Sequence, residues 1–132
     1  MRYLSIYKAA ESNVPPTTDE MAAMGQLIEE LTTSGVLLAT EGCLPSAKGV
    51  RVRRSGDNVT VTDGPFTEAK ELVAGFALFE VKSKDEMIGL AKRFLDLVGD
   101  GECEIRQIWG PEDLGAEVSP ELREQEERMS AR

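Results

Sequence analysis

The segment Val73–Val81 constrains the fold most, because its side chains are apolar at odd and even positions alike. A strand with two apolar faces belongs inside a sheet, with a neighbouring strand along each edge. The turn residues Asp63-Gly64-Pro65 precede it and must end any earlier strand, since proline fixes φ and glycine and aspartate favour turns. We therefore expect Val73–Val81 to be a central strand.

Two segments have the capping-box spacing that begins an α-helix, Thr17–Glu20 and Ser83–Glu86. Apolar residues then recur at helical period on one stripe of each segment. Glycine follows each stripe, where a left-handed cap is needed. The first helix is predicted over Thr18–Ser34, and the second continues until Gly99 ends it.

The remaining strand candidates show β-type composition or alternation. They are Arg2–Lys8, Val36–Glu41, Glu102–Trp109, and the two halves of a hairpin, Gly49–Arg54 and Asn58–Asp63. In the hairpin, the valines should share one face while Arg51 and Arg53 project from the other. One or two helical turns are expected over Phe66–Leu72, and Ser119-Pro120 predicts a short helix in the charged tail.

This order of elements predicts a ferredoxin-like α+β sandwich: an antiparallel βαββαβ sheet with an inserted hairpin and two helices on one face. Residues 1–110 would form the domain and residues 111–132 a charged extension. The helices have one apolar stripe each and cannot cover both faces, so a second copy is expected on the free face. The second and last strands of such a sheet lie at opposite edges, so no disulfide is expected between Cys43 and Cys103.

The chain has 24 acidic and 15 basic residues and a net charge of −9, which disfavours direct binding to nucleic acid or to a membrane. It has two cysteines without C-x-x-C spacing and no histidine, so neither a metal nor another cofactor is indicated. No apolar stretch resembles a signal peptide, and we expect a cytoplasmic protein with reduced thiols.

The stretch Asp63-Gly64-Pro65-Phe66, with the Glu68, Lys70-Glu71 and Gly75-Phe76 that follow, resembles the signature of the DGPF subgroup of YCII-related proteins. Glu41-Gly42 and Arg51-Val52-Arg53 are also similar to what these proteins carry, and the resemblance covers about Arg2 to Trp109. It implies the homodimeric α/β-barrel form of the ferredoxin-like fold. The histidine–aspartate pair suggested for YCII-type relatives has no counterpart here, because the chain has no histidine.

Three residues are candidates for catalysis. Asp63, at a strand end, would act as a general base, or else as a turn cap that accepts hydrogen bonds from the amides around Phe66. Lys70 would act as a nucleophile or electrophilic clamp, or else lie solvated beside Glu68 or Glu71. Glu41 is interpreted either as a barrel-facing acid or as an edge carboxylate.

Other residues are candidates for ligand binding. The side chains of Tyr3, Ser5 and Tyr7 share one strand face, and would orient a ligand or pack in a dimer interface. Arg53 belongs to a basic cluster that would bind an anion or remain solvated, and Phe66 lies in the signature turn.

Two functions follow as hypotheses. The first is an enzyme or binding protein for a small molecule that acts in the cleft of the dimer. The second is a non-catalytic interaction module with a protein partner. Since DGPF-type proteins are often encoded beside extracytoplasmic-function sigma factors, the resemblance links this module to sigma-factor-dependent transcription.

Overall fold

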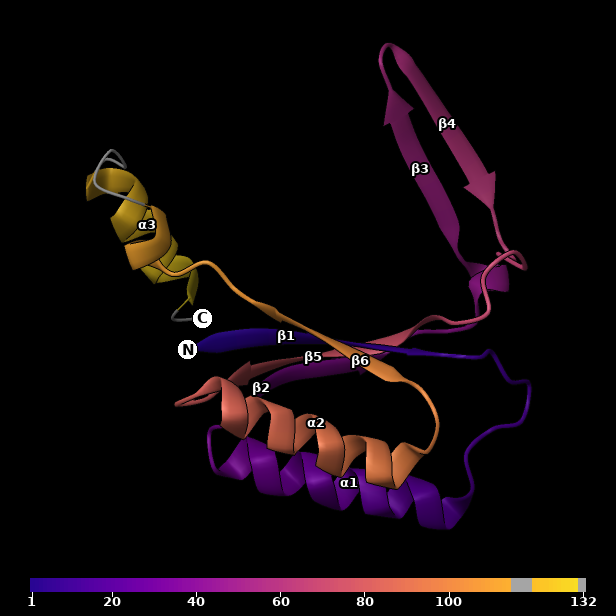
Figure 1. The fold of residues 1–132 in the computed structure, drawn as a ribbon, viewed down its shortest axis with the longest axis horizontal. Coiled ribbons are helices and arrows are strands. Elements are labelled where there is room, and N and C mark those ends of the chain that lie inside the picture. The colour runs from indigo at the N-terminus through magenta and orange to yellow at the C-terminus, as the bar shows by residue number, and fades with distance from the viewer. Residues whose placement is uncertain (115–119, 131–132) are drawn as a thin grey trace.

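The computed structural model describes residues 1–114 and 120–130. Its centre is a four-stranded antiparallel sheet in the order β2-β5-β1-β6 (Figure 1). The strands are β1 (Arg2–Ala9), β2 (Leu37–Gly42), β5 (Leu72–Glu80) and β6 (Glu102–Gln107). β5 pairs with β1 on one edge and with β2 on the other, which confirms the predicted central strand.

The helices α1 (Thr18–Thr33) and α2 (Lys84–Val98) lie side by side on one face of this sheet (Figure 1). Both predicted caps are present, because Thr17 Oγ1 accepts a hydrogen bond from the Glu20 amide and Ser83 Oγ accepts one from the Glu86 amide, each at 3.1 Å. Gly99 follows α2 with φ of +90°, a conformation that glycine adopts at little cost. The two predicted helices are therefore confirmed within a residue or two at their ends.

The core lies between the sheet and the helices. Its buried apolar residues are Tyr3, Leu31, Leu37, Phe79, Val81 and Met87. Met87 on α2 is fully enclosed. Burial of such side chains is the main favourable term in folding, so this layer supplies most of the stability.

In the described part of the chain, no helix lies over the opposite face of the sheet (Figure 1). Residues paired across antiparallel strands share a face, so Leu4 lies beside Leu78 and Ile6 beside Phe76 on this side. We call the surface formed by these four residues the free face. The Phe76 side chain is 38% exposed, which is unusual for a phenylalanine in a central strand. The whole arrangement is consistent with a ferredoxin-like α+β fold.

The hairpin strands β3 (Val50–Ser55) and β4 (Asn58–Asp63) form a separate two-stranded sheet that projects from the side of the free face (Figure 1). All residues of both strands are exposed. Val52 pairs with Val61, and Arg53 pairs with Thr60. The predicted division into a valine face and an arginine face is therefore confirmed.

The segment between β4 and β5 contains no helix, so the predicted helical turns over Phe66–Leu72 are wrong. One backbone hydrogen bond spans the turn, from the Ala69 amide to the Phe66 carbonyl at 3.3 Å. A helix needs several such bonds in succession to offset the entropic cost of nucleation. Propagation stops because Leu72 already pairs with Ala9 in the main sheet.

After β6 the chain forms the short helix η2 (Pro111–Leu114) and the helix α3 (Pro120–Ser130). A short helix in the tail was predicted and is confirmed from Pro120 onward, while its predicted cap at Ser119 lies outside the described residues. Both cysteines are free thiols. No helix in the described part of the chain combines the length and apolar character needed to cross a bilayer.

Replacing Met87 by alanine should lower the free energy of unfolding by about 2–5 kcal/mol, because the cavity left in the core cannot close completely. Urea unfolding followed by circular dichroism measures this loss. Ile88→Ala is the matched control, since Ile88 is the next residue on α2 and is 37% exposed. A similar loss for both variants would contradict the proposed location of the core.

Candidate functional site

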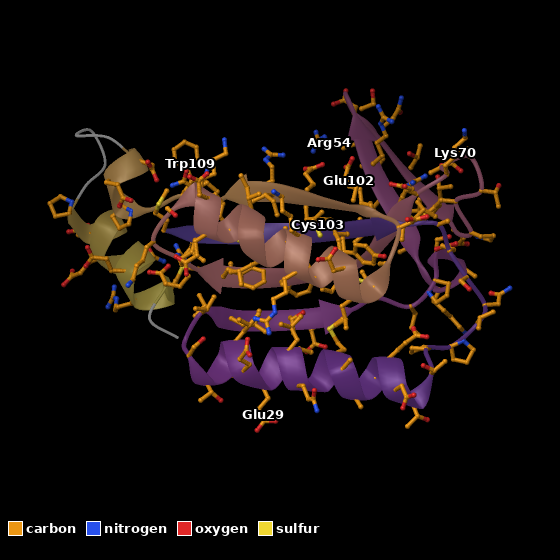
Figure 2. All side chains as sticks on the ribbon, turned by 60° about the horizontal axis from the view of Figure 1, so that its bottom comes forward. Glu29, Arg54, Lys70, Glu102, Cys103 and Trp109 are labelled. Carbon is orange, nitrogen blue, oxygen red and sulfur yellow. The ribbon has the colours of Figure 1, made fainter. Side chains whose placement is uncertain are left out.

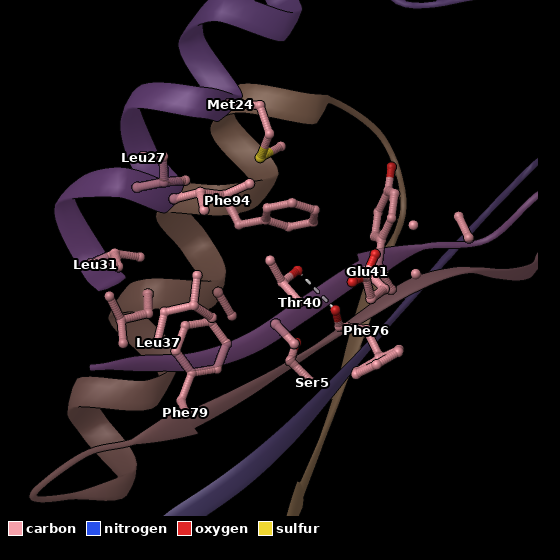
Figure 3. A pocket seen from close by; sticks show the side chains of 18 residues that line it. Ser5, Met24, Leu27, Leu31, Leu37, Thr40, Glu41, Phe76, Phe79 and Phe94 are labelled. Atoms are coloured by element: carbon pink, nitrogen blue, oxygen red, sulfur yellow. Dashed lines mark hydrogen bonds between the residues drawn. The ribbon is translucent and has the colours of Figure 1, made fainter. Parts of the chain in front are cut away.

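A cavity of about 370 Å³ lies between the sheet and the two helices (Figure 3). Met24, Leu27 and Leu31 of α1 and Phe94 of α2 form its outer wall. Strand residues including Ser5, Tyr7, Thr40 and Ala77 form its floor. We call this cavity the Tyr7 pocket.

The pocket exists because side-chain size changes along the helix-facing side of the sheet. Paired residues form three rows across the strands from β2 to β6. The rows are Gly42, Gly75, Tyr7 and Cys103; then Thr40, Ala77, Ser5 and Ile105; then Leu37, Phe79, Tyr3 and Gln107. The last row is rich in large side chains and fills the space under the helices. The first two rows contain glycine, alanine and serine, and leave that space open.

Tyr7 is held in a fixed position at one end of the pocket. Its hydroxyl donates a hydrogen bond to the Asp100 carbonyl at 3.2 Å, and its ring meets Phe94 edge to face with 5.1 Å between centroids. The loop after α2 approaches so closely that a Cβ on Gly101 would lie 2.5 Å from Tyr7 Cε1. Burial raises the pKa of Tyr7, and nearby Cys103, Glu71 and Asp100 raise it further.

Two other hydroxyls line the pocket floor. Thr40 Oγ1 donates to the Phe76 carbonyl at 2.9 Å, the dashed line in Figure 3. Ser5 is 7% exposed, and its side chain hydrogen-bonds to Cys103. Burial raises the pKa of the Cys103 thiol, and the bond from Ser5 offsets part of this rise. Cys103 is therefore kept as a neutral thiol beside the pocket.

Glu41 lies at the rim of the pocket. Figure 3 shows Glu41 and Phe76 at the end of the pocket away from Leu31 and Leu37. Glu41 pairs with Phe76 and therefore shares the free face with it, where it is exposed to solvent. Of the predicted site residues, the pocket thus brings together Ser5 and Tyr7, while the side chain of Glu41 lies on the other face of the sheet. Tyr3 lies on the same face of the sheet as Ser5 and Tyr7 but belongs to the closed core.

The other predicted site residues lie outside the pocket lining. Asp63 is exposed at the end of β4, and Arg53 is exposed in β3. Lys70 is exposed beside the hairpin, as Figure 2 shows. The three residues predicted for catalysis therefore do not converge within this chain. In the described residues, no three histidine, cysteine or acidic side chains form a group that could hold a metal ion.

Ser46, which the sequence did not single out, organises the signature turn. It is 8% exposed, and its hydroxyl accepts a hydrogen bond from the Phe66 amide at 3.0 Å. The same hydroxyl donates to Glu11 Oε2 at 2.9 Å. A Cβ on Gly64 would lie 1.7 Å from the Ser46 carbonyl oxygen, so only glycine fits there. The Phe66 amide thus donates to Ser46, whereas Asp63 was predicted to accept from the amides around Phe66.

Phe66 also ties the hairpin to the turn. The Arg51 guanidinium lies 3.8 Å from the centre of the Phe66 ring. Arg51 also forms an ion pair with Glu68, which lowers the pKa of Glu68. Phe66 therefore has a structural role at the base of the hairpin.

The antiparallel sheet, the helices on one face and the cavity between them define a small α+β sandwich of ferredoxin-like type. The family model of the YCII-related domain matches residues 1–111, so the chain belongs to the YCII-related family. A comparison with curated proteins gave no match.

Ser46→Ala should lower the free energy needed to open the turn by about 1–3 kcal/mol. The Phe66 amide should therefore exchange with solvent faster. The reason is that the buried Phe66 amide and the Glu11 carboxylate both lose a partner. Amide hydrogen exchange measured by NMR reports this directly. Asp63→Ala is the control and should change the same opening by no more than about 0.5 kcal/mol. An equal effect of the two variants would show that Asp63 stabilises the turn as much as Ser46 does.

Proposed function

We propose that this protein binds a small, largely apolar molecule in the Tyr7 pocket. The observation that carries the proposal is the cavity of about 370 Å³ at the end of the sheet where side chains are small. Its size lies in the range of ligand sites, which are typically apolar with a few polar groups that fix orientation.

The pocket offers a ligand two kinds of contact. Leu27, Leu90 and Phe94 would bury a hydrocarbon body between the layers. Tyr7 and Thr40 would orient its polar end. Glu41, a predicted catalytic residue, lies on the free face with Phe76, so we propose it as an acid or base in the dimer cleft and not in the pocket.

A second proposal concerns assembly. We propose that two copies pack their free faces together to form a dimeric α/β barrel. If the protein is the non-catalytic interaction module predicted above, the free face is its dimerisation surface. The support is the apolar surface of exposed Phe76 and half-buried Leu4, Ile6 and Leu78, which no element of the same chain covers among the described residues. The Asp63–Phe66 stretch supports membership of the DGPF subgroup, in which this assembly is expected.

Binding in the pocket can be tested with 2-phenylethanol, a neutral probe that fits an apolar cavity. The probe should raise the melting temperature of the protein, because a ligand that binds only the native state stabilises it. Ala77→Leu should abolish this rise by filling the floor of the pocket. Ala22→Leu, at an exposed position of α1, should leave the rise intact. An unchanged response in Ala77→Leu would place the binding site elsewhere.

Dimerisation can be tested with Leu78→Asp, which puts a charge on the free face without altering a pocket-lining residue. Light scattering after size exclusion should give the mass of two chains for the wild type and of one chain for the variant, because an unpaired charge in an apolar interface is costly. Circular dichroism checks that the variant is folded. Met21→Asp, on the exposed side of α1, should remain dimeric. A monomeric wild type would refute the proposed barrel.

A further inference from the structure

The hairpin of β3 and β4 has an apolar face that nothing in the described part of the chain covers. Val50, Val52, Val59 and Val61 share this face, and each is 53–67% exposed. We call these four residues the valine face. A two-stranded sheet with no packed face is at best marginally stable in water. The valine face is therefore expected to pack against something outside the chain.

The base of the hairpin sets the direction in which it projects. The Gly64 amide donates a hydrogen bond to the Gly49 carbonyl at 3.0 Å, at the point where the hairpin leaves the body. The bond from the Phe66 amide to Ser46 Oγ holds the same point. The hairpin is thus held on the side of the free face (Figure 1).

A second copy packed on the free face would lie within reach of the hairpin. Each strand of the hairpin has six residues, which span about 20 Å at about 3.3 Å per residue. Two sheets packed face to face are only about 10 Å apart. The hairpin would therefore extend past the interface and along the flank of the second copy.

The other end of the sheet carries the features that such an arm would bind. α3 rises there on the same side of the sheet as the hairpin (Figure 1). η2 and α3 contain six acidic and two basic residues. Trp109 lies at this end (Figure 2) and is 63% exposed. We call Trp109, η2 and α3 the tail end.

Charge decides which ends of two copies meet. When the strands of packed sheets are roughly aligned, a two-fold axis sets either the two tail ends together or each tail end beside the hairpin of the other copy. The first arrangement brings two acidic surfaces together, which is repulsive. The second sets each acidic surface beside a hairpin that carries Arg53 and Arg54. Charge complementarity therefore favours the second arrangement.

We infer that the hairpin is an arm that binds a second copy of this chain. Its valine face packs on the partner's Trp109, while the charges of Arg53 and Arg54 attract the acidic η2 and α3 of that copy. By symmetry the contact forms twice. This inference rests on the proposed dimer of free faces and adds a second, separate contact surface to it.

Trp109 is the single tryptophan of the chain, so its fluorescence reports this contact directly. In the wild-type dimer, Trp109 should emit at shorter wavelength and be quenched less by acrylamide than in the monomeric variant Leu78→Asp. The reason is that the valines of the partner copy would exclude water from the indole ring.

Two neighbouring substitutions on β4 test the valine face. Val61→Asp puts a charge on that face, and Thr60→Asp puts the same charge on the opposite face of the hairpin. Val61→Asp should weaken dimerisation at least about tenfold in analytical ultracentrifugation, because the charge would be buried without a partner. At concentrations where this variant is still dimeric, its Trp109 should emit as in the monomer. Thr60→Asp should stay within about twofold of the wild type and keep its emission, since position 60 is exposed and faces away from the contact.

The outcomes separate the arm contact from the dimer on which it rests. If the wild type is a dimer but its Trp109 emits and is quenched as in Leu78→Asp, the arm contact is overturned and the dimer of free faces stands. The same conclusion follows if Val61→Asp and Thr60→Asp behave alike. If the wild type is a monomer, the arm contact and the proposed dimer both fail.

Discussion

β5 has two apolar faces, but the helices can bury only one of them. α1 and α2 both pack on the side of Phe79, where the core forms. The other side, with Phe76 and Leu78, has no element over it in the described part of the chain. This imbalance follows from the single apolar stripe on each helix. It explains why one sequence gives both a closed core and an exposed apolar patch.

On the helix-covered face of the sheet, side-chain size decides where the core is filled and where a cavity remains. Leu37, Phe79 and Tyr3 fill the space under the helices at one end of the sheet. Gly75 and Ala77 leave it open at the other end. An empty cavity forfeits dispersion contacts that a larger side chain would make. At Gly75 the backbone itself requires a small residue, because a Cβ there would lie 2.9 Å from the Glu41 carbonyl oxygen. At Ala77 the proposed binding of a ligand would account for the small side chain.

The elements that the sequence predicted well depend on local signals. The caps at Thr17 and Ser83 and the alternation in the hairpin act over a few residues, so they can be seen without tertiary information. The helical turns expected over Phe66–Leu72 failed because pairing of Leu72 with Ala9, distant in sequence, overrode the local preference.

The candidate site was predictable only in part, for the same reason. That Ser5 and Tyr7 share a face follows from strand alternation, but β1 has apolar groups on both faces, so the sequence does not indicate which face the helices cover. Ser46 meets Glu11 and Phe66 from positions 35 and 20 residues away along the chain. No periodicity or turn signal connects residues so far apart.

The hairpin formed by β3 and β4 is attached to the body at a few anchored points near Ser46 and Phe66, and its own residues are exposed. Its sequence is thus largely uncoupled from the core and from the Tyr7 pocket. Substitutions that would unfold the protein elsewhere are tolerated in such an appendage. The hairpin can therefore present side chains for contacts outside the chain without disturbing the interior.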